Sequence, residues 1–404
     1  MAGKNDGKIR CSFCGKTQDQ VGKLISGPNG AYICDECVDI CAEIIEEENF
    51  DESKDSSAKE DINLIKPEEM KAFLDDYVIG QDQAKKVLSV AVYNHYKRVL
   101  AGNDLGVELQ KSNILMLGPT GSGKTLLAQT LARVINVPFA IADATTLTEA
   151  GYIGDDVEII LEKLLDVCEG DVERAQRGIV FIDEIDKLSS THSSTEKKVG
   201  GKGVQQALLK LLEGSMVDVP YADKGGFGDS KKVRLQVDTS QILFICGGAF
   251  PDLENIIKQR ISKKSRMGFC EKSAGYMDCP KQDILLSTEK EDLEAFGMIP
   301  EFLGRLPIIV SLEELTVETL KQILSEPKDC LVEQYKKLLQ YDGVHLEFEP
   351  DALEEIAKRA YNEKTGARSL RAIMEKTLRD IMFEAPDQEC GERVLITKEL
   401  VANI

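Results

Sequence analysis

A glycine-rich segment that ends in a lysine and a threonine could bind phosphate. It reads Gly118-Pro119-Thr120-Gly121-Ser122-Gly123-Lys124-Thr125. The glycines allow a tight turn with inward-pointing N–H groups, Lys124 could reach the β- and γ-phosphates, and the Thr125 hydroxyl could bind Mg²⁺. An apolar run, 113–117, precedes the segment, and a helical pattern, 126–135, follows it. This strand–turn–helix context favours a nucleotide site over an ordinary strand-to-helix turn.

Two acidic residues follow a second apolar run, 178–182. Asp183 and Glu184 stand at the carboxyl end of this predicted buried strand. In a parallel α/β sheet that end lies beside the phosphate loop, so Asp183 could hold Mg²⁺ through water and Glu184 could orient and deprotonate an attacking water. A lone Asp-Glu pair is commonly a solvated strand end. The phosphate loop earlier in the chain is what favours hydrolysis here.

Four cysteines near the amino terminus have the spacing of a metal site. Cys11 with Cys14, and Cys34 with Cys37, form two C-x₂-C pairs, which are typical of a four-thiolate zinc site. Residues 1–50 contain few apolar side chains, so zinc would supply much of the folding free energy, about 10–16 kcal/mol in comparable peptides. The alternative is a redox pair or unrelated thiols. A closed Cys₄ site has no open position, so its role would be structural, in a binding module.

Composition limits the class of protein. The chain has 404 residues, 42% of them hydrophobic, and a formal charge of −20. These values allow two or three domains and disfavour a partner bound through nucleic-acid phosphates. The start of the chain has no apolar leader, and no stretch is long enough to span a bilayer. Eleven cysteines, an odd number, argue against a disulfide framework. We therefore expect a cytoplasmic protein without a nucleic-acid or membrane partner.

The order of predicted elements divides the chain into three parts and a linker. The zinc module would cover 1–50, and a flexible, acidic, serine-containing linker 51–66. From 67 to 312 helical patterns alternate with short apolar strands, which predicts an α/β domain with a parallel five-stranded sheet and flanking helices. Residues 313–404 are mostly helical and would form a smaller domain. The expected strands are 114–117, 138–142, 179–182, 242–246 and 308–310.

Five further strings carry a resemblance to a known family. They are DDYVIGQ (75–81), DATTLTEAGY (143–152), GVQQALLK (203–210), ICGGAF (245–250) and PEFLGRLP (300–307). With these strings the chain closely resembles the ClpX family of AAA+ unfoldases over nearly its whole length. The amino-terminal Cys₄ module strengthens the match, because the related HslU ATPases lack it. The resemblance implies an AAA+ P-loop ATPase in a homo-hexameric ring, with ATP bound between subunits.

The resemblance also implies roles for residues outside the phosphate loop. Tyr77, Val78 and Ile79 would flank the adenine, although an isolated Tyr-Val-Ile is more simply core packing. Arg305 would be the arginine finger that reaches the γ-phosphate of the neighbouring subunit. Arg368 would sense the nucleotide between the large and small domains, whereas residue chemistry alone ranks a surface salt bridge higher. No convincing polar sensor follows the strand predicted at 242–246.

Two exposed loops are implied to contact other proteins. Gly151-Tyr152-Ile153-Gly154 resembles the pore loop of the family, whose aromatic residue grips polypeptides; the alternative is a turn that buries Tyr152. Met267-Gly268-Phe269 occupies the place of the tripeptide that docks on the ClpP peptidase, with Met as a less usual first residue. The stretches 190–202 and 221–234 depart from the family pattern, so the choice of substrate is not predicted.

The sequence thus predicts an ATPase that unfolds and translocates proteins through a hexameric pore and delivers them to ClpP, without being a peptidase itself. Lys124, Asp183, Glu184 and Arg305 from a neighbour would carry catalysis, with ATP, Mg²⁺ and Zn²⁺ as cofactors and with protein substrates and adaptors as partners. A remodelling chaperone without a protease partner is one alternative. A nucleotide-gated adaptor or scaffold with vestigial hydrolysis is another. A nucleic-acid motor is disfavoured by the charge and the aromatic loop.

Overall fold

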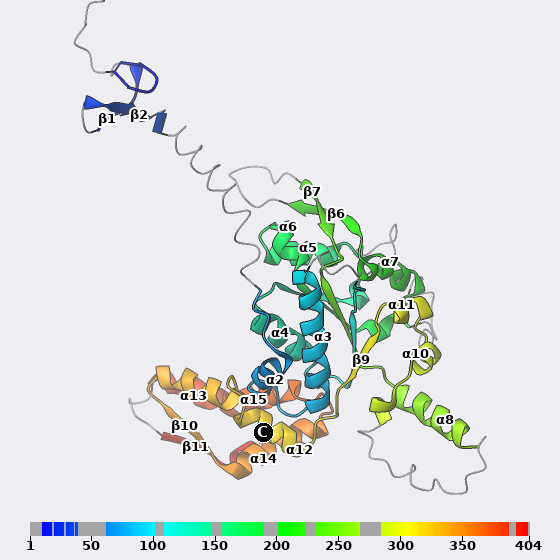
Figure 1. Ribbon diagram of the computed structural model, residues 1–404. Helices are drawn as coiled ribbons and strands as arrows, with labels where there is room; N and C mark the ends of the chain where they lie inside the picture. The colour runs from blue at the N-terminus through cyan, green and yellow to red at the C-terminus, as the bar shows by residue number, and fades with distance from the viewer. Residues whose placement is uncertain are drawn as a thin grey trace, which may run out of the picture. The chain divides into compact units, whose positions relative to one another are not determined.

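The computed structural model describes most of the chain in two compact units, Met1–Asp61 and Ile62–Ile404 (Figure 1). Each unit is considered by itself. The described residues are 10–17, 20–27, 30–35, 37–38, 62–101, 109–147, 156–189, 201–222, 232–266, 284–387 and 393–402.

The first unit contains a small antiparallel hairpin. Its strands are β1 (Leu24–Ser26) and β2 (Tyr32–Cys34), with Leu24 opposite Cys34. An isolated bridge between Arg10 and Thr17 closes a second turn. Within the described part of this unit, the buried apolar side chains are those of Cys11 and Cys34, while Phe13 and Ile25 are exposed. The described part therefore has no apolar core that could hold the fold without another source of free energy.

Five parallel strands form the central sheet of the second unit, in the order β4-β5-β8-β3-β9. The structure confirms all five predicted strands, with ends that shift by at most two residues. At the carboxyl edge Leu117 pairs with Gly248, and Asp143 pairs with Asp183. The strands are β3 (Ile114–Leu117), β4 (Phe139–Asp143), β5 (Ile179–Asp183), β8 (Leu243–Gly248) and β9 (Ile308–Ser311).

Helices cover both faces of this sheet, as the continuous apolar runs of its inner strands require. Alternate residues point to opposite faces: Ile114 and Met116 join one core, Leu115 and Leu117 the other. The first core is covered by α2 (Pro67–Asp75), α3 (Asp82–Ala101) and α4 (Lys124–Ile135). The second core is covered by α5 (Ile159–Val167), α6 (Val172–Gln176), α7 (Gly201–Glu213), α8 (Leu253–Arg266), α10 (Lys290–Phe296) and α11 (Pro300–Gly304).

An antiparallel hairpin of β6 (Met216–Ala222) and β7 (Lys232–Asp238) was not predicted. Val219 and Tyr221 are buried against the second core, and Asp218 and Pro220 lie between and beside them in the chain. This alternation was the available signal for a strand. Pro220 is compatible with a strand here, because both strands of a two-stranded ribbon are edge strands, where the missing N–H of proline can face away from the partner strand.

The carboxyl-terminal helices have a core of their own, which includes Leu320, Ile356 and Leu378. Figure 1 shows a short parallel pair of strands at one edge of these helices. The helices are α12 (Val317–Ser325), α13 (Leu331–Tyr341), α14 (Pro350–Asn362), α15 (Arg368–Glu384) and α16 (Lys398–Ala402), and the strands are β10 (His345–Phe348) and β11 (Arg393–Ile396).

Four short 3₁₀ turns complete the described elements: η3 (Ala144–Thr146), η4 (Ile185–Leu188), η5 (Leu285–Ser287) and η6 (Ala385–Asp387). Turn η4 follows β5 directly and carries the chain away from the acid pair. Among the described helices, none combines the length and the apolar composition needed to cross a bilayer.

Gln81 ties the start of α3 to the segment that follows β9. Its buried side-chain amide donates to the Glu313 carbonyl (3.0 Å) and accepts from the Glu313 N–H (2.9 Å). The pair satisfies both backbone groups of Glu313 where the chain leaves the sheet. The backbone of Gln81 itself is left-handed, with φ 60°.

Replacing Gln81 with alanine should lower the free energy of unfolding by about 1–3 kcal/mol, because both backbone groups of Glu313 lose their partner at a partly buried position. Thermal denaturation of the full chain measures this loss. Gln334→Ala is the matched control: its amide also donates to a carbonyl, that of Asp329, at 2.6 Å, but on the surface. Equal midpoints for the two variants would contradict the assigned role of Gln81.

Candidate functional site

The phosphate loop leaves β3 and enters α4 through residues that only glycine suits. Gly121 (φ 77°) and Gly123 (φ 100°) are left-handed, and Gly123 is the N-cap of α4. A Cβ on Gly121 would collide with the Thr365 carbonyl oxygen. The N–H groups at the start of the twelve-residue helix α4 consequently face the same space as the loop, an arrangement that favours an anion.

Lys124 lies inside the loop that precedes it. Its side chain is 8% exposed, and Nζ donates to the carbonyls of Gly118 (2.6 Å) and Pro119 (3.0 Å). Burial lowers the pKa of the Lys124 ammonium below its ordinary value, although the carboxylates of Asp183 and Asp186 act in the opposite direction. The cation is thus held at the loop by neutral carbonyls and faces two acids across the cavity.

The acid pair sits at a strained turn. Glu184 has left-handed backbone angles (φ 57°, ψ 31°), which cost a non-glycine residue about 1–3 kcal/mol. Its N–H donates to Asp183 Oδ1 at 2.9 Å. Gly247 in the neighbouring strand β8 leaves space for the Phe181 ring of β5, since a Cβ at 247 would lie 2.6 Å from that ring. Such strain is often found where a side chain must point into a functional cavity.

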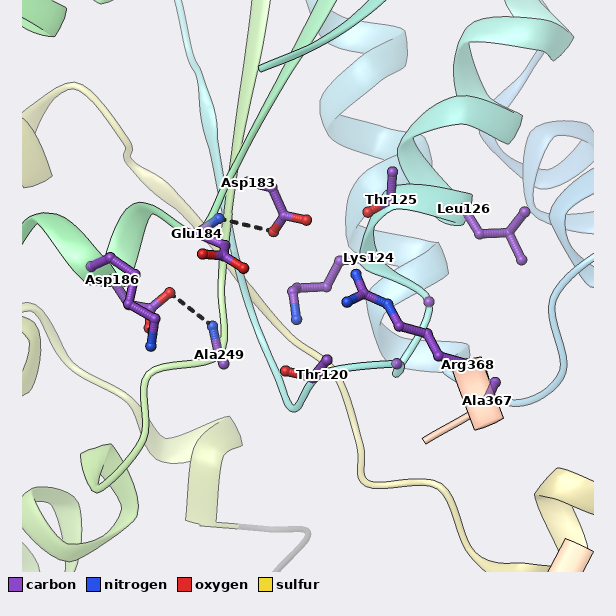
Figure 2. Close-up of a pocket in the computed structure, with 13 residues that line it drawn as sticks. Thr120, Lys124, Thr125, Leu126, Asp183, Glu184, Asp186, Ala249, Ala367 and Arg368 are labelled. Carbon is purple, nitrogen blue, oxygen red and sulfur yellow. Dashed lines mark hydrogen bonds and ion pairs between the residues drawn. The ribbon is translucent and has the colours of Figure 1, made fainter. Parts of the chain in front are cut away.

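One cavity of about 540 Å³ collects the loop, the acid pair and the start of α15 (Figure 2). Its volume lies in the range of small-molecule sites. The sequence predicted Lys124, Thr125, Asp183 and Glu184 for this site, but not Asp186. The position of Asp186, two residues after Glu184, could have indicated it. The lining residues are Thr120, Gly121, Gly123, Lys124, Thr125, Leu126, Asp183, Glu184, Asp186, Lys187, Ala249, Ala367 and Arg368.

Arg368 reaches this cavity from the carboxyl-terminal helices. It is the first residue of α15, and Ala367 before it donates its N–H to the Gly121 carbonyl at 3.2 Å. A Cβ on Gly366 would come within 2.7 Å of the Thr120 carbonyl oxygen. Among the described residues Arg368 forms no ion pair, so the surface salt bridge favoured by residue chemistry is not found there.

Arg305 lies outside the cavity of its own chain. It caps the carboxyl end of α11, and its Nε and Nη2 contact Glu213 Oε1 at 3.0 and 2.8 Å. Both side chains are about half exposed, at 53% and 46%. Glu213, the last residue of α7, was not identified from the sequence, because the pair joins residues far apart in the chain.

The tripeptide Tyr77-Val78-Ile79 does not line this cavity. Val78 is buried in the core beneath α2 and α3, and the Tyr77 ring lies 5.0 Å from the ring of Phe73 and 5.5 Å from the Arg133 guanidinium. Contact of these residues with adenine stays a prediction. The predicted pore loop, Gly151-Tyr152-Ile153-Gly154, and the predicted docking tripeptide, Met267-Gly268-Phe269, lie outside the described residues.

The four amino-terminal cysteines converge in the first unit. The Sγ atoms of Cys11, Cys14, Cys34 and Cys37 all lie within 4.8 Å of one another. Burial acts to raise the pKa of the Cys11 thiol, but N–H groups of Cys14, Phe13 and Cys34 outweigh it and lower this pKa to about 6. Four converging sulfurs, one already favoured as a thiolate, fit a tetrahedral zinc ion.

Three family models match separate parts of the chain. The ClpX C4-type zinc finger matches residues 9–47, which include all four cysteines. The AAA domain (Cdc48 subfamily) matches residues 109–309, which include the phosphate loop and the acid pair. The C-terminal, D2-small domain, of ClpB protein matches residues 315–391, which include Arg368. The chain thus combines a zinc module with an ATPase domain, so Zn²⁺ and ATP are its ligands.

Replacing Cys34 with serine should release the zinc and unfold the first unit, because its described part lacks an apolar core. Zinc content by metal analysis and the reactivity of the remaining thiols measure this on the full chain. Cys330→Ser is the matched control, since Cys330 is buried among the carboxyl-terminal helices. Undiminished zinc in the Cys34 variant would contradict the assignment.

Proposed function

The chain is a ClpX-like Clp/Hsp100 ATPase, and from this premise we propose that it uses ATP hydrolysis to unfold proteins and to translocate them through a ring of six copies. One observation carries the proposal: the phosphate loop, the acid pair and Arg368 line a single cavity in a chain that also has a ClpX-type zinc finger. A protein that only binds nucleotide would not need an acid pair opposite the lysine.

In this proposal the walls of the cavity divide the work of hydrolysis. Lys124 and the N–H groups that begin α4 bind the β- and γ-phosphates. Glu184 orients an attacking water and accepts its proton, and the left-handed turn that aims its side chain supports this role. Thr125 and Asp183 hold Mg²⁺, which supplies positive charge beside the phosphates.

Two arginines would connect hydrolysis to motion. Arg305 lies outside its own cavity and is half exposed, which supports its action on the nucleotide of a neighbouring copy. Arg368 lines the cavity of its own chain, and the Ala367–Gly121 hydrogen bond supports direct coupling between the loop and α15. Nucleotide state would then alter the angle between a large domain, 67–312, and a small domain, 313–404.

The contacts with other proteins follow from the ClpX-like class. Tyr152 in its glycine-flanked loop would grip the translocating polypeptide, and Met267-Gly268-Phe269 would dock the ring on the ClpP peptidase. The zinc module would bind substrates or adaptor proteins. ATP-dependent degradation of a tagged folded protein, with and without ClpP, tests this proposal as a whole. Unfolding without degradation would favour a remodelling chaperone instead.

Glu184→Gln should retain ATP binding and lower the turnover of ATP by about 10²–10⁴-fold, because the amide cannot accept a proton from water. Steady-state hydrolysis and the binding of a fluorescent ATP analogue separate the two effects. Glu173→Gln, an exposed acid on α6, is the matched control and should hydrolyse ATP normally. Normal turnover in the Glu184 variant would remove this residue as the base.

Phe269→Ala should leave ATP hydrolysis intact but abolish stimulation of ClpP, because an apolar docking contact is lost. Peptide cleavage by ClpP in the presence of the ring and ATP measures the coupling. Phe383→Ala is the matched control, since this phenylalanine is exposed on α15. Unchanged stimulation by the Phe269 variant would contradict the docking role.

A further inference from the structure

Asp186 is a buried acid in the nucleotide cavity for which the proposed hydrolysis has no use. It belongs to turn η4, and its side chain is 3% exposed although it borders the cavity. Figure 2 shows it beyond Glu184, on the side away from Lys124. A carboxylate is costly to bury unless it accepts hydrogen bonds, so its contacts indicate its task.

The contacts of Asp186 join two strands of the sheet. Oδ1 accepts the N–H of Ala249, just after β8, at 3.2 Å. Oδ2 accepts no hydrogen bond among the described residues and lies 3.3 Å from Nζ of Lys187, which is 51% exposed. The hydrogen bond from Ala249 therefore fixes the orientation of this side chain, and the Lys187 ammonium partly balances its charge.

The end of β8 is shaped to admit this carboxylate. A Cβ on Gly248 would lie 2.8 Å from Asp186 Oδ1 and 2.5 Å from the ring of Phe250. No other amino acid would fit at 248 without displacing one of them. The glycine lets the acid approach the backbone of β8 closely.

Gly248, the last residue of β8, also holds the phosphate loop. The Gly248 carbonyl accepts the N–H of Gly118, the first residue of the loop, at 3.2 Å. Gly248 and Ala249 thus bind the loop through a carbonyl and the Glu184 turn through an N–H. This short backbone segment sets how far the phosphate cradle lies from the acid pair.

We propose that Asp186 is a positioning residue that fixes the turn carrying Glu184 against the phosphate loop by accepting the Ala249 N–H. The inference rests on the proposed role of Glu184 as base. Glu184 needs such support, because its left-handed backbone is strained and would relax if the turn were free. Ile185 and Leu188 are buried, and the Gln205 amide donates to the Leu188 carbonyl at 2.9 Å. Gln205 thus holds the end of η4, whereas Asp186 holds its beginning, beside Glu184.

The role requires an acceptor and not a charge. Asparagine can accept the same N–H through its side-chain oxygen, while its amide nitrogen would replace the oxygen that accepts no hydrogen bond. Alanine removes the acceptor and leaves the partly buried Ala249 N–H without it. The two substitutions therefore separate positioning from any chemistry that needs a carboxylate.

Steady-state ATP hydrolysis by the full chain tests the proposal. Asp186→Ala should lower kcat by about 10- to 100-fold, the effect of a small misplacement of a catalytic group, with KM and the affinity for a fluorescent ATP analogue within about threefold of wild type. Asp186→Asn should recover most of kcat. Asp171→Ala is the matched control: Asp171, the exposed N-cap of α6, accepts the N–H of Arg174 at 3.1 Å, and this variant should keep normal kcat.

Two results would overturn the proposal: wild-type kcat in Asp186→Ala, or an asparagine variant as slow as the alanine variant. Gly248→Ala provides a second approach if Asp186→Ala does not fold, because the new Cβ would displace the Asp186 carboxylate from the side of the neighbouring strand β8. Its kcat should fall, and an unchanged kcat would contradict the role. Absence of hydrolysis by the wild-type chain would instead refute the proposed function.

Discussion

The nucleotide cavity depends on the absence of side chains at the carboxyl end of β8. This strand lies between β3, which leads into the phosphate loop, and β5, which ends in the acid pair. Gly247 gives the Phe181 ring its space, and Gly248 gives space to Asp186. The Gly248 carbonyl binds the phosphate loop, and the N–H of Ala249, just after β8, binds Asp186. Lys124, after one neighbouring strand, and the acids, after the other, therefore face the same cavity.

A second backbone contact brings the carboxyl-terminal helices into the same arrangement. The Gly121 carbonyl accepts the Ala367 N–H, and glycines at 121 and 366 allow the two turns to approach closely. Any side chain at either position would separate the turns. We therefore expect a change in the phosphate loop to reach the first turn of α15 through main-chain groups, which cannot change rotamer as a long arginine side chain can.

Local sequence patterns predicted the elements but not their long-range contacts. The five strands, the acid pair and the converging cysteines follow from apolar runs and fixed spacings, and the structure brings them together as expected. The β6–β7 hairpin was missed because its strands alternate apolar with polar residues and contain Pro220, unlike the continuous apolar runs of the central sheet. Asp186 and Glu213 were missed for a different reason: their partners, Ala249 and Arg305, lie distant in the chain, and no local period encodes such a pairing.

Arg305 has a backbone that is held in place and a side chain that is held only weakly. The buried amide of Asn113, just before β3, donates to the carbonyls of Arg305 and Leu212, both at 3.0 Å, so the backbone of the arginine is tied to the strand that feeds the phosphate loop. Within the described part of the chain, its guanidinium pairs with the half-exposed Glu213, and such surface pairs contribute about 0–1 kcal/mol. A phosphate of a bound nucleotide carries more charge than one carboxylate and would displace Glu213 at little cost. The backbone of the proposed arginine finger is therefore fixed, while its side chain can exchange Glu213 for a phosphate.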